Sequence, residues 1–422
     1  MPDSSRSPWR FVPTLYFAEG VPYILVNSVS VVLYKRLGID NAAIAFWTSL
    51  LYLPWVAKML WSPAVDTRGT KRNWILGAQA ALAACLAALA VGVGLPGAFA
   101  VTLAVFWLAA LVSATHDIAA DGFYLYALGE REQALFVGVR TLFYRAAMIF
   151  GSGFLVFLAG RLELRLGAVP RAWSLAFAIA AALFGALALW HRFALPRPAG
   201  DMPRARQAAA PGAGWGRIFA AWFRQRRAAA ILAFILLFRL GEALLLKLAA
   251  PFLLDERAQG GLGFTTAQVG LAYGTLGLGS LILGGVLGGW LIARFGLRRL
   301  LWPLGLVLNV PHAAYLYMAI AQPGPALAYP LVAIEQLGYG LGTTAFMVVL
   351  MRASRGEHRT SHYAIATGFM ALGMMLPGML SGAIQGALGY PRFFLLVLLL
   401  GLPGLATLPF LPRFADESPP AA

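Results

Sequence analysis

Long apolar stretches, separated by short polar loops, recur along all 422 residues of the chain. Each stretch is roughly 20 residues or longer, the length that an α-helix needs to cross about 30 Å of hydrocarbon. Because the sequence lacks the ten-residue alternation of membrane β-strands, these stretches are predicted to be helices. The predicted spans are residues 11–33, 42–63, 74–95, 99–127, 134–160, 172–194, 229–253, 265–293, 299–321, 326–351, 361–388 and 391–411.

The composition agrees with a protein whose main solvent is lipid. Hydrophobic residues make up 60% of the chain and charged residues 12%, whereas a soluble domain is about half apolar and about a quarter charged. These values exclude a soluble enzyme, a disordered chain and a nucleic-acid-binding module, so no nucleic-acid partner is expected. The chain has a single cysteine, Cys85, and no Gly-x-x-x-x-Gly-Lys phosphate loop. We therefore expect neither a cofactor nor a bound metal.

The placement of charge predicts the orientation in the membrane. The net charge is +16, and most Lys and Arg residues lie in loops on the side of the two termini. An even number of spans puts both termini on one side, and loops rich in Lys and Arg mark the cytoplasmic side. The sequence therefore predicts a multi-pass membrane protein with both termini in the cytoplasm.

The longest connection between spans, residues 195–228, is rich in Pro, Arg, Ala and Gly. It is predicted to be a cytoplasmic linker between an N-terminal six-helix bundle, residues 1–194, and a C-terminal six-helix bundle, residues 229–422. Its last part, residues 215–227, is either an amphipathic helix on the inner leaflet or part of a plain solvated linker.

The two halves of the chain repeat each other. Several glycines in equivalent loops and spans recur at a constant offset of 227 residues. The pairs are Gly69 and Gly296, Gly129 and Gly356, and Gly151 and Gly378. A constant offset at three landmarks indicates a duplicated six-helix unit, as in transporters built from two halves around a site at the membrane midplane.

A short basic loop follows the second span of each half. It resembles the signature loop of the major facilitator superfamily, Gly-x-x-x-Asp-Arg-x-Gly-Arg-Arg. The second copy has Gly289, Arg294, Gly296, Arg298 and Arg299, with Ala293 at the acidic position, and the first has Asp66, Gly69 and Arg72, with Ser62 at the leading glycine. The resemblance implies an all-α integral membrane protein with twelve transmembrane helices in two pseudo-symmetric six-helix bundles. We expect the loops to form a cytoplasmic gate that contains Asp66, Arg68, Gly69, Arg72, Arg294, Gly296 and Arg298.

Within the superfamily, nearly the whole chain resembles the AmpG-type muropeptide permeases and their relatives, which include acetyl-CoA carriers and siderophore uptake permeases. The resemblance rests on segments 17–22 (Phe-Ala-Glu-Gly-Val-Pro), 58–63, 113–121, 240–243, 251–254, 263–265 and 340–346. It implies a monomeric, proton-coupled transporter of the bacterial inner membrane that imports an amphiphilic solute by alternating access. The expected partners are the lipid bilayer, protons and a small-molecule substrate. Muropeptides lead as the substrate, with a siderophore or another small metabolite as the alternative.

Ionisable residues inside the membrane mark candidate functional positions, because each costs about 2.5–3.5 kcal/mol at the bilayer centre. Seven of them fall in the first, fourth, seventh and tenth spans, which the resemblance implies line a central cavity. They are Glu19, Asp117, Asp121, Arg239, Glu242, Lys247 and Glu335. The predicted substrate cavity contains Glu19, Tyr23, Asp117, Tyr124, Arg145, Arg239, Glu242, Lys247 and Glu335.

Proton coupling is predicted for Asp117, Asp121 and Glu19. Asp117 and Asp121 are four residues apart and share one face of a helix. Two carboxylates that close in a low dielectric resist double ionisation, so one of them is expected to hold a proton. Alternatively, Asp121 caps or pairs with a loop arginine, and Glu19 pairs with a basic residue.

Several of these side chains also have a structural interpretation. Arg145 either clamps an anionic group of the substrate or pairs with Asp117 or Asp121. Arg239 and Glu242 are three residues apart, so they either serve the cavity or neutralise each other.

The sequence leaves two other function classes open. A membrane-embedded transferase could use His116, Asp117 and Asp121 to bind a divalent metal, although His116 is also typical of a packing residue. A sensor derived from a transporter is the other class. His312, in the ninth span, is expected to be structural.

Overall fold

The computed structural model describes residues 7–201, 215–225, 227–354 and 359–412, and these contain helices and no strand. The chain divides into two compact units. Each unit is described by itself below.

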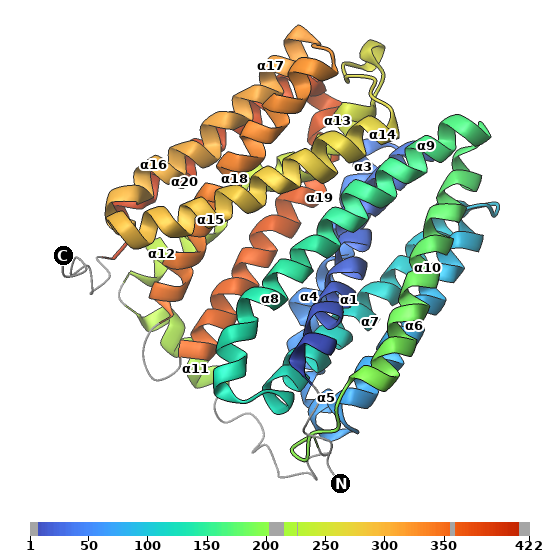
Figure 1. Cartoon of the computed structure of the whole chain (residues 1–422). Helices are drawn as coiled ribbons and strands as arrows, with labels where there is room; N and C mark the ends of the chain where they lie inside the picture. Colours follow the sequence, from blue (N-terminus) through green and yellow to red (C-terminus); the bar gives the residue numbers. More distant parts are fainter. Residues whose placement is uncertain (1–6, 202–214, 226, 355–358, 413–422) are drawn as a thin grey trace. The chain divides into compact units, whose positions relative to one another are not determined.

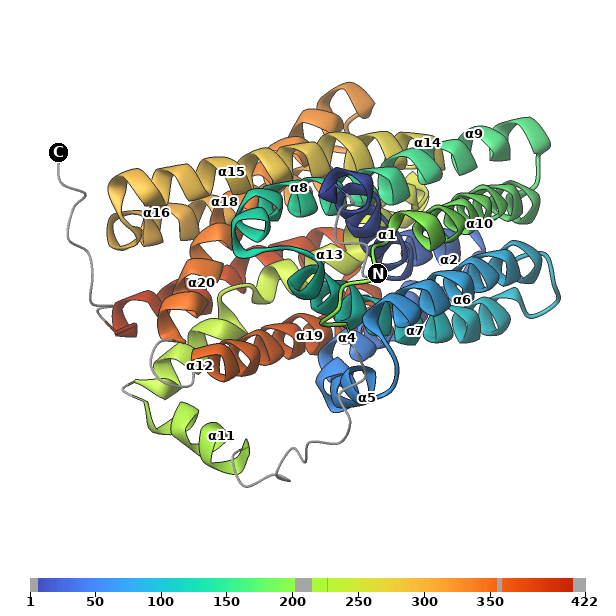
Figure 2. The same ribbon diagram turned by 60° about the horizontal axis from the view of Figure 1, so that its bottom comes forward.

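The first unit comprises Met1–Ile39, Leu50–Ala209 and Thr265–Gly274. In it, α6 packs along both α7 and α10, and α1 packs against α7 and α8 (Figures 1 and 2). Its helices are α1 (Val12–Ile24), α2 (Ser30–Arg36), α4 (Leu53–Ala57), α5 (Ser62–Thr67), α6 (Lys71–Gly92), α7 (Ala98–Ala127), α8 (Glu130–Met148), α9 (Val156–Leu166), α10 (Val169–Ala194) and α14 (Thr266–Val269).

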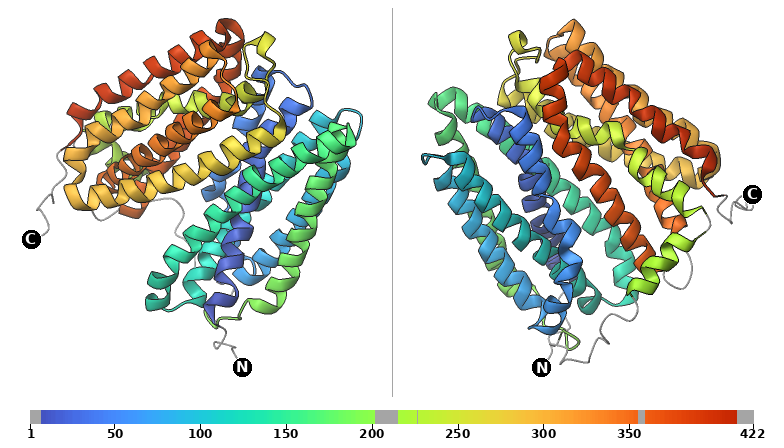
Figure 3. Two further views of the ribbon diagram at one scale, coloured as in Figure 1. Left: turned by 45° about the horizontal axis from the view of Figure 1, so that its top comes forward. Right: turned by 180° about the vertical axis from the view of Figure 1, so that it is seen from behind.

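The second unit comprises Asp40–Ser49, Ala210–Phe264 and Thr275–Ala422. Here α18 packs against α15 and α16 (Figure 1), and the long red-orange α19 packs along the yellow-green α13 (Figure 3). Its helices are α3 (Asn41–Leu50), α11 (Trp215–Arg224), α12 (Ala228–Leu237), α13 (Leu240–Leu254), α15 (Leu278–Phe295), α16 (Leu297–Asn309), α17 (Ala313–Ala321), α18 (Pro325–Ala353), α19 (Arg359–Leu399) and α20 (Gly401–Ala406).

The helices account for the predicted membrane crossings. Within the described residues, ten helical segments are long and apolar enough to cross a membrane. One of them, Ile365–Phe410, has 46 residues and is interrupted at Gly389, where φ is 72° and ψ is 165°. That segment therefore supplies two crossings, and the shorter apolar stretch Asn41–Ala57 supplies the remaining predicted one.

The second predicted span, 42–63, is a series of short helices rather than one long helix. Helix α3 ends at Leu50, and α4, the 3-10 turn Lys58–Leu60 and α5 follow. Pro54 lies in the first turn of α4 and Pro63 in the first turn of α5. Proline has no N–H group to donate to the preceding turn, so an uninterrupted helix cannot pass through these positions without a kink.

The first span contains a wide helical turn. After Pro22, residues Leu25–Val29 form a π-helix, and α2 then continues to Arg36. Similar turns occur at Ile149–Leu155 and Gly270–Gly277. Such turns are rare inside α-helices and change the direction in which the following side chains point. Beyond the first of them, Arg36 Nε donates a hydrogen bond to Glu163 Oε2 at 3.1 Å.

Each unit has its own buried hydrophobic core. In the first unit, Phe11 and Phe123 pack with their ring centroids 5.8 Å apart. In the second, Phe234 stacks on Phe346 at 5.4 Å. Helix α11 (Trp215–Arg224) covers most of the described part of the segment 215–227, and its fully buried Trp222 packs against Phe369 of α19 with the ring centroids 5.4 Å apart. The sequence left a helix and a plain linker as alternatives for this segment, and the structure has a helix there.

Candidate functional site

In the first unit, a carboxyl pair lies between α1 and α7. Glu19 is buried in α1, and its carboxyl group lies within hydrogen-bonding reach of that of Asp117 in α7. A carboxylate is only an acceptor, so two carboxyl groups can share a hydrogen bond only when one of them carries a proton. Lys58, in the turn after α4, places Nζ 2.9 Å from Asp117 Oδ2. The arrangement therefore combines a proton-sharing pair with a cation that can balance a negative charge.

Asp121 lies one turn further along α7 and has different partners. Its Oδ1 forms an ion pair with Arg140, with the atoms 3.0 Å apart, and accepts a hydrogen bond from the hydroxyl of Tyr16 at 3.2 Å. The Arg140 guanidinium also lies 4.5 Å from the ring centroid of Tyr16 and 5.3 Å from that of Tyr124. We call the set Glu19, Lys58, Asp117, Asp121 and Arg140 the acidic cluster.

An aromatic group adjoins the acidic cluster. Tyr23 of α1 has its ring centroid 5.3 Å from that of Trp55, 6.0 Å from that of Tyr144 and 6.3 Å from that of Tyr52. All four side chains are partly exposed. The indole N–H of Trp55 has no hydrogen-bond partner among the described residues. Rings arranged in this way can stack on an apolar face of a ligand while the N–H donates to a ligand oxygen.

His116 turns away from Asp117. It is fully buried, and its Nε2 lies 3.0 Å from the side-chain amide of Gln79. Gln79 Oε1 lies 2.8 Å from His191 Nδ1, and His191 Nε2 lies 2.9 Å from the hydroxyl of Thr14. The two neighbours His116 and Asp117 thus have different partners, and His116 belongs to a buried polar network that joins α1, α6, α7 and α10.

In the second unit, two predicted cavity residues contact a histidine. Glu242 of α13, His312 after α16 and Glu335 of α18 are all fully buried. His312 Nε2 lies 2.9 Å from Glu242 Oε2, and one ligand-type atom from each of the three residues lies within 4.8 Å of the others. We call these three residues the Glu–His–Glu group.

The two other predicted cavity cations of this unit have partners outside the Glu–His–Glu group. Arg239 donates a hydrogen bond to the hydroxyl of Tyr339, and its guanidinium lies 5.6 Å from the ring centroid of Phe346. Lys247 donates to the backbone oxygen of Thr48 at 3.2 Å. Among the described residues, no ion pair joins Arg239 to Glu242.

Two further predicted cavity residues lie in the first unit. The hydroxyl of Tyr124 donates to the backbone oxygen of Gln133 at 2.5 Å. Arg145 is partly exposed on α8. Within the described part of the chain, no hydrogen bond or ion pair joins Arg145 to Asp117 or Asp121, whose basic partners are Lys58 and Arg140.

The first copy of the predicted gate loop is anchored at the start of α6. Asp201 accepts hydrogen bonds from the backbone N–H groups of Lys71 at 2.6 Å and Arg72 at 3.0 Å, which satisfies free donors of the first helical turn. The Arg72 guanidinium donates to the backbone oxygen of Arg192, at the end of α10. Gly69 has φ 89°, a conformation that favours glycine. The side chain of Asp66 lies outside the described residues.

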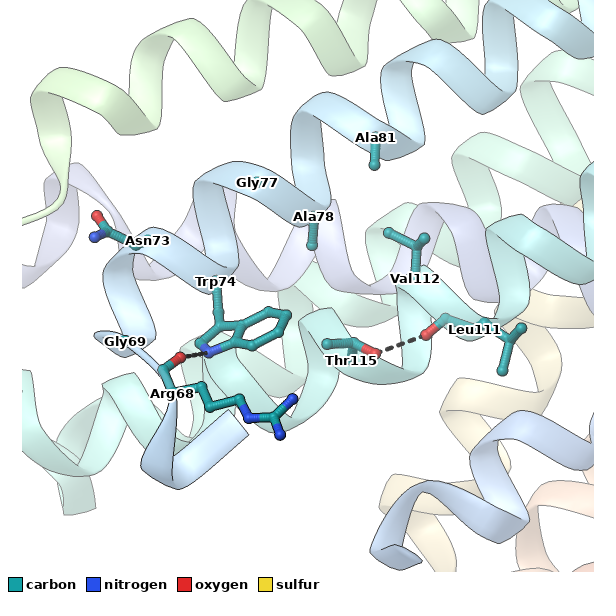
Figure 4. A pocket seen from close by; sticks show the side chains of 10 residues that line it. All are labelled: Arg68, Gly69, Asn73, Trp74, Gly77, Ala78, Ala81, Leu111, Val112 and Thr115. Carbon is teal, nitrogen blue, oxygen red and sulfur yellow. Dashed lines mark hydrogen bonds between the residues drawn. The ribbon is translucent and has the colours of Figure 1, made fainter. Parts of the chain in front are cut away.

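Beside this loop lies a pocket of about 460 Å³, which Figure 4 shows from close by. At one end, the indole N–H of Trp74 donates to the backbone oxygen of Arg68 at 2.5 Å. The remaining lining residues are mostly small or apolar and come from α6 and α7; they are Asn73, Gly77, Ala78, Ala81, Leu111, Val112 and Thr115. An apolar slot of this kind fits hydrocarbon better than a polar solute.

The second copy of the loop begins at the end of α15. Gly296 has φ 81°. Arg294 lies 5.8 Å from the ring centroid of Trp290 and 5.7 Å from that of Phe295. Arg298 is exposed in the first turn of α16. The positive φ angles at Gly69 and Gly296 show that both copies need glycine at this position of the turn.

Comparisons with known proteins agree with this arrangement. Residues 240–422 match the family model of the Major Facilitator Superfamily. The fold is similar to that of a D-xylose–proton symporter, with a TM-score of 0.72 over 97% of this chain and 98% of that chain at 12% identity. The C-terminal part of the chain therefore resembles the Major Facilitator Superfamily, and the chain as a whole has a fold similar to that of a known symporter.

Two curated relatives of this chain are named as permeases or transporters. It is 28% identical over 405 residues to the anhydromuropeptide permease of Escherichia coli, a match that covers 93% of this chain and 77% of that one. It is 23% identical to a putative transporter AmpG 4 of Rickettsia conorii, with 94% of each chain covered. The predicted resemblance to the superfamily and the helical membrane fold are thereby confirmed, and these relatives are a permease and a transporter rather than enzymes.

Three residues that contact the predicted acids were not identified from the sequence. They are Lys58 and Arg140 in the acidic cluster and His312 in the Glu–His–Glu group. Each lies inside a predicted span, at 42–63, 134–160 and 299–321. Lys58 and Arg140 could have been found from their charge. An unpaired cation inside the membrane is costly, so each of them is expected to lie close to a carboxylate. For His312, its burial beside Glu242 depends on helix packing that the sequence does not state.

Proposed function

We propose that this transporter imports muropeptides, the sugar–peptide fragments of the cell wall, together with protons across the bacterial inner membrane. In this proposal it works as a monomer by alternating access of two bundles, residues 1–194 and 229–422, with the linker and both termini in the cytoplasm. The similarity to the anhydromuropeptide permease of Escherichia coli supports the substrate class. The distribution of Lys and Arg among the loops supports the orientation.

The closeness of the buried carboxyl groups of Glu19 and Asp117 carries the coupling part of the proposal. The pair needs a proton to form a hydrogen bond between them, and losing the proton leaves an extra negative charge between α1 and α7. Lys58, 2.9 Å from Asp117, can balance that charge. A site that accommodates both protonation states at moderate cost is what a proton-coupled carrier requires. Asp121, paired with Arg140, is the third proposed member of the relay.

The chemistry of a muropeptide suits the side chains around this pair. Sugar rings have apolar faces that stack on aromatic rings, and Tyr23, Tyr52, Trp55 and Tyr144 present such rings. The unpaired indole N–H of Trp55 is a donor for a sugar or amide oxygen.

The peptide portion carries carboxylates, for which cationic side chains are the natural contacts. We propose Arg145, Arg239 and Lys247 for this role, because an arginine can bind a carboxylate through two parallel hydrogen bonds and a lysine through its point charge. The basic loops after the second span of each half, with Asp66 in the first copy, are proposed to gate the cytoplasmic side.

The test is uptake by the purified chain in liposomes. A labelled anhydromuropeptide is supplied outside, with and without an inward proton gradient. We expect accumulation above the outside concentration only with the gradient, and its collapse on addition of a protonophore. Liposomes without protein and liposomes offered a ferric siderophore serve as controls. Gradient-driven accumulation of the chelate but not of the muropeptide would move the substrate to the siderophore alternative, and equal uptake with and without the gradient would remove proton coupling.

A further inference from the structure

The Glu–His–Glu group joins three separate elements of the second unit. Glu242 comes from α13, His312 from the 3-10 turn Val310–His312, and Glu335 from α18. Gly241, next to Glu242, allows these elements to pack closely, because it has no side chain. A Cβ atom at Gly241 would lie 2.4 Å from the backbone oxygen of Val397 and 3.6 Å from His312 Nδ1. A glycine there lets α13 approach α19 closely while the histidine ring stays beside Glu242.

The group leaves buried polar atoms without hydrogen bonds. All three residues have 0% exposure. Glu242 Oε1, His312 Nδ1 and Glu335 Oε1 have no hydrogen-bond partner among the described residues. Buried polar atoms are nearly always satisfied, so three orphaned atoms on three neighbouring side chains require an explanation. A ligand that accepts lone pairs from carboxylates and imidazole would supply it.

The charge of the group must also be neutralised. Two ionised carboxylates beside a neutral imidazole would carry two negative charges, and isolated charges in a low dielectric cost several kcal/mol each, so the group holds either protons or a cation. The nearest cations in the sequence have other partners, since Arg239 binds the hydroxyl of Tyr339 and Lys247 binds the backbone of Thr48. A divalent cation would neutralise the two carboxylates completely.

We propose that Glu242, His312 and Glu335 bind one divalent transition-metal ion, with Zn²⁺ as the preferred ion. Imidazole nitrogen together with carboxylate oxygen is a ligand set for Zn²⁺, whereas Mg²⁺ and Ca²⁺ prefer oxygen ligands alone. Zinc bonds of about 2.0–2.2 Å in tetrahedral geometry place ligand atoms roughly 3.4 Å apart. The present limit of 4.8 Å therefore needs only a small contraction by side-chain rotation. A water molecule would complete the tetrahedron.

A supporting hydrogen bond orients one of these ligands. The side-chain amide of Gln336 donates to Glu335 Oε2 at 3.0 Å, which leaves Oε1 available for the ion. Partners that hold a ligand in this way commonly contribute about 10–100-fold to metal affinity. The ion would clamp α13, the turn at His312 and α18 together. This role goes beyond the proposed transport function and does not depend on the substrate or on proton coupling.

Metal analysis of the full-length chain tests the proposal. The protein is purified in detergent through a tag without histidines, stripped with a chelator, reloaded with Zn²⁺ and desalted. Elemental analysis is expected to find about one Zn²⁺ per chain in the parent and less than about a tenth as much in Glu335→Gln and Glu242→Gln, since each removes one ligand charge. The matched control is His191→Gln, which removes a fully buried histidine outside the group and is expected to keep the parent's metal content.

Two measurements keep the test independent of folding defects. Thermal unfolding in chelator should give similar midpoints for the parent and Glu335→Gln, and added Zn²⁺ should raise only the parent's midpoint, because a ligand that binds only the native state stabilises it. Co²⁺ added to the stripped parent should produce a visible absorption band that Zn²⁺ removes. No metal above background in the parent, or equal metal in the parent and both Gln variants, would overturn the proposal and leave protons as the neutralising ligands.

Discussion

The Nζ atom of Lys58 lies 2.9 Å from Oδ2 of Asp117, and the two residues come from different membrane spans. The lysine lies in the 3-10 turn Lys58–Leu60, between the short helices α4 and α5. The carboxyl group of Asp117 also lies within hydrogen-bonding reach of that of Glu19. Asp117 is thus the one carboxyl of the acidic cluster that contacts both a cation and a second acid.

Asp117→Asn is expected to abolish gradient-driven accumulation while leaving exchange of substrate across the membrane. The amide keeps the shape of the side chain but cannot bind and release a proton, and exchange needs only the conformational change of the loaded carrier. Accumulation and counterflow of labelled muropeptide in liposomes measure the two activities separately. Asp121→Asn is the matched comparison, because Asp121 is 46% exposed and pairs with Arg140, so we expect a slower but still gradient-dependent carrier. Full gradient-dependent accumulation by Asp117→Asn would move the proton to Glu19 or Asp121.

Trp55→Leu is expected to raise the KM for muropeptide uptake about tenfold, with a smaller change in maximal rate. The substitution removes an aromatic face that lies 5.3 Å from Tyr23 and an N–H donor without a partner. Losing a stacking contact of about 1.4 kcal/mol corresponds to that factor. Trp302→Leu is the control, because Trp302 is 46% exposed on α16. An unchanged KM in Trp55→Leu would separate the aromatic group from substrate binding.

Gly382→Ala is expected to destabilise the protein, whereas Gly386→Ala is not. A Cβ atom at Gly382 would lie 2.0 Å from the backbone oxygen of Asn41, but one at Gly386 would meet nothing within 4 Å. Forcing an extra methyl group into a packed contact typically costs about 1–3 kcal/mol. We expect a thermal midpoint several degrees lower for Gly382→Ala in detergent. Equal midpoints for the two variants would mean that α3 and α19 do not pack as closely as described.

The orientation can be tested with reporter fusions. A fusion near residue 210 and one at the C-terminus should both report the cytoplasm, and one at Ala168, between α9 and α10, should report the periplasm. The reason is the excess of Lys and Arg in the loops on the side of the termini. Reporters of opposite preference, one active in each compartment, provide the control at every position. A periplasmic signal at residue 210 would contradict the twelve-span topology.

Much of the fold could be predicted because a membrane-spanning helix is a local signal. A run of about 20 apolar residues is enough by itself to predict a membrane-spanning helix. The predicted spans 74–95 and 99–127 accordingly correspond to single helices, Lys71–Gly92 and Ala98–Ala127. The prediction was less accurate for 42–63, which was treated as one helix although Pro54 and Pro63 interrupt it. The π-helical turns left no pattern in the sequence that hydropathy could detect.

The candidate site was harder to predict because its contacts are not local. The sequence indicated that Asp117 and Asp121 share a helical face, yet their cations come from positions 58 and 140, and which cation serves which acid depends on helix packing. Sequence spacing left two interpretations of Arg239 and Glu242 open, namely cavity residues or mutual neutralisation, and the described contacts do not pair the two side chains with each other. They are three residues apart, but Arg239 binds Tyr339 and Glu242 contacts His312.

The π-helical turn at Leu25–Val29 lies between two regular helical stretches of the first span. A π-helical turn closes its hydrogen bonds over five residues instead of four, so it holds one residue more than an α-helical turn, and a deletion there can be absorbed by a return to regular helix. In the regular helix beyond it, each residue turns the chain by about 100°, so deleting one of residues 30–35 would rotate Arg36 by that angle. The rotation would carry Arg36 away from Glu163, whose carboxylate also accepts hydrogen bonds from Trp173 at 2.8 Å and from Thr266 at 2.7 Å. A homologue could therefore lose one residue at the wide turn and keep Arg36 in place, whereas a deletion beyond the turn would need a compensating change near Glu163.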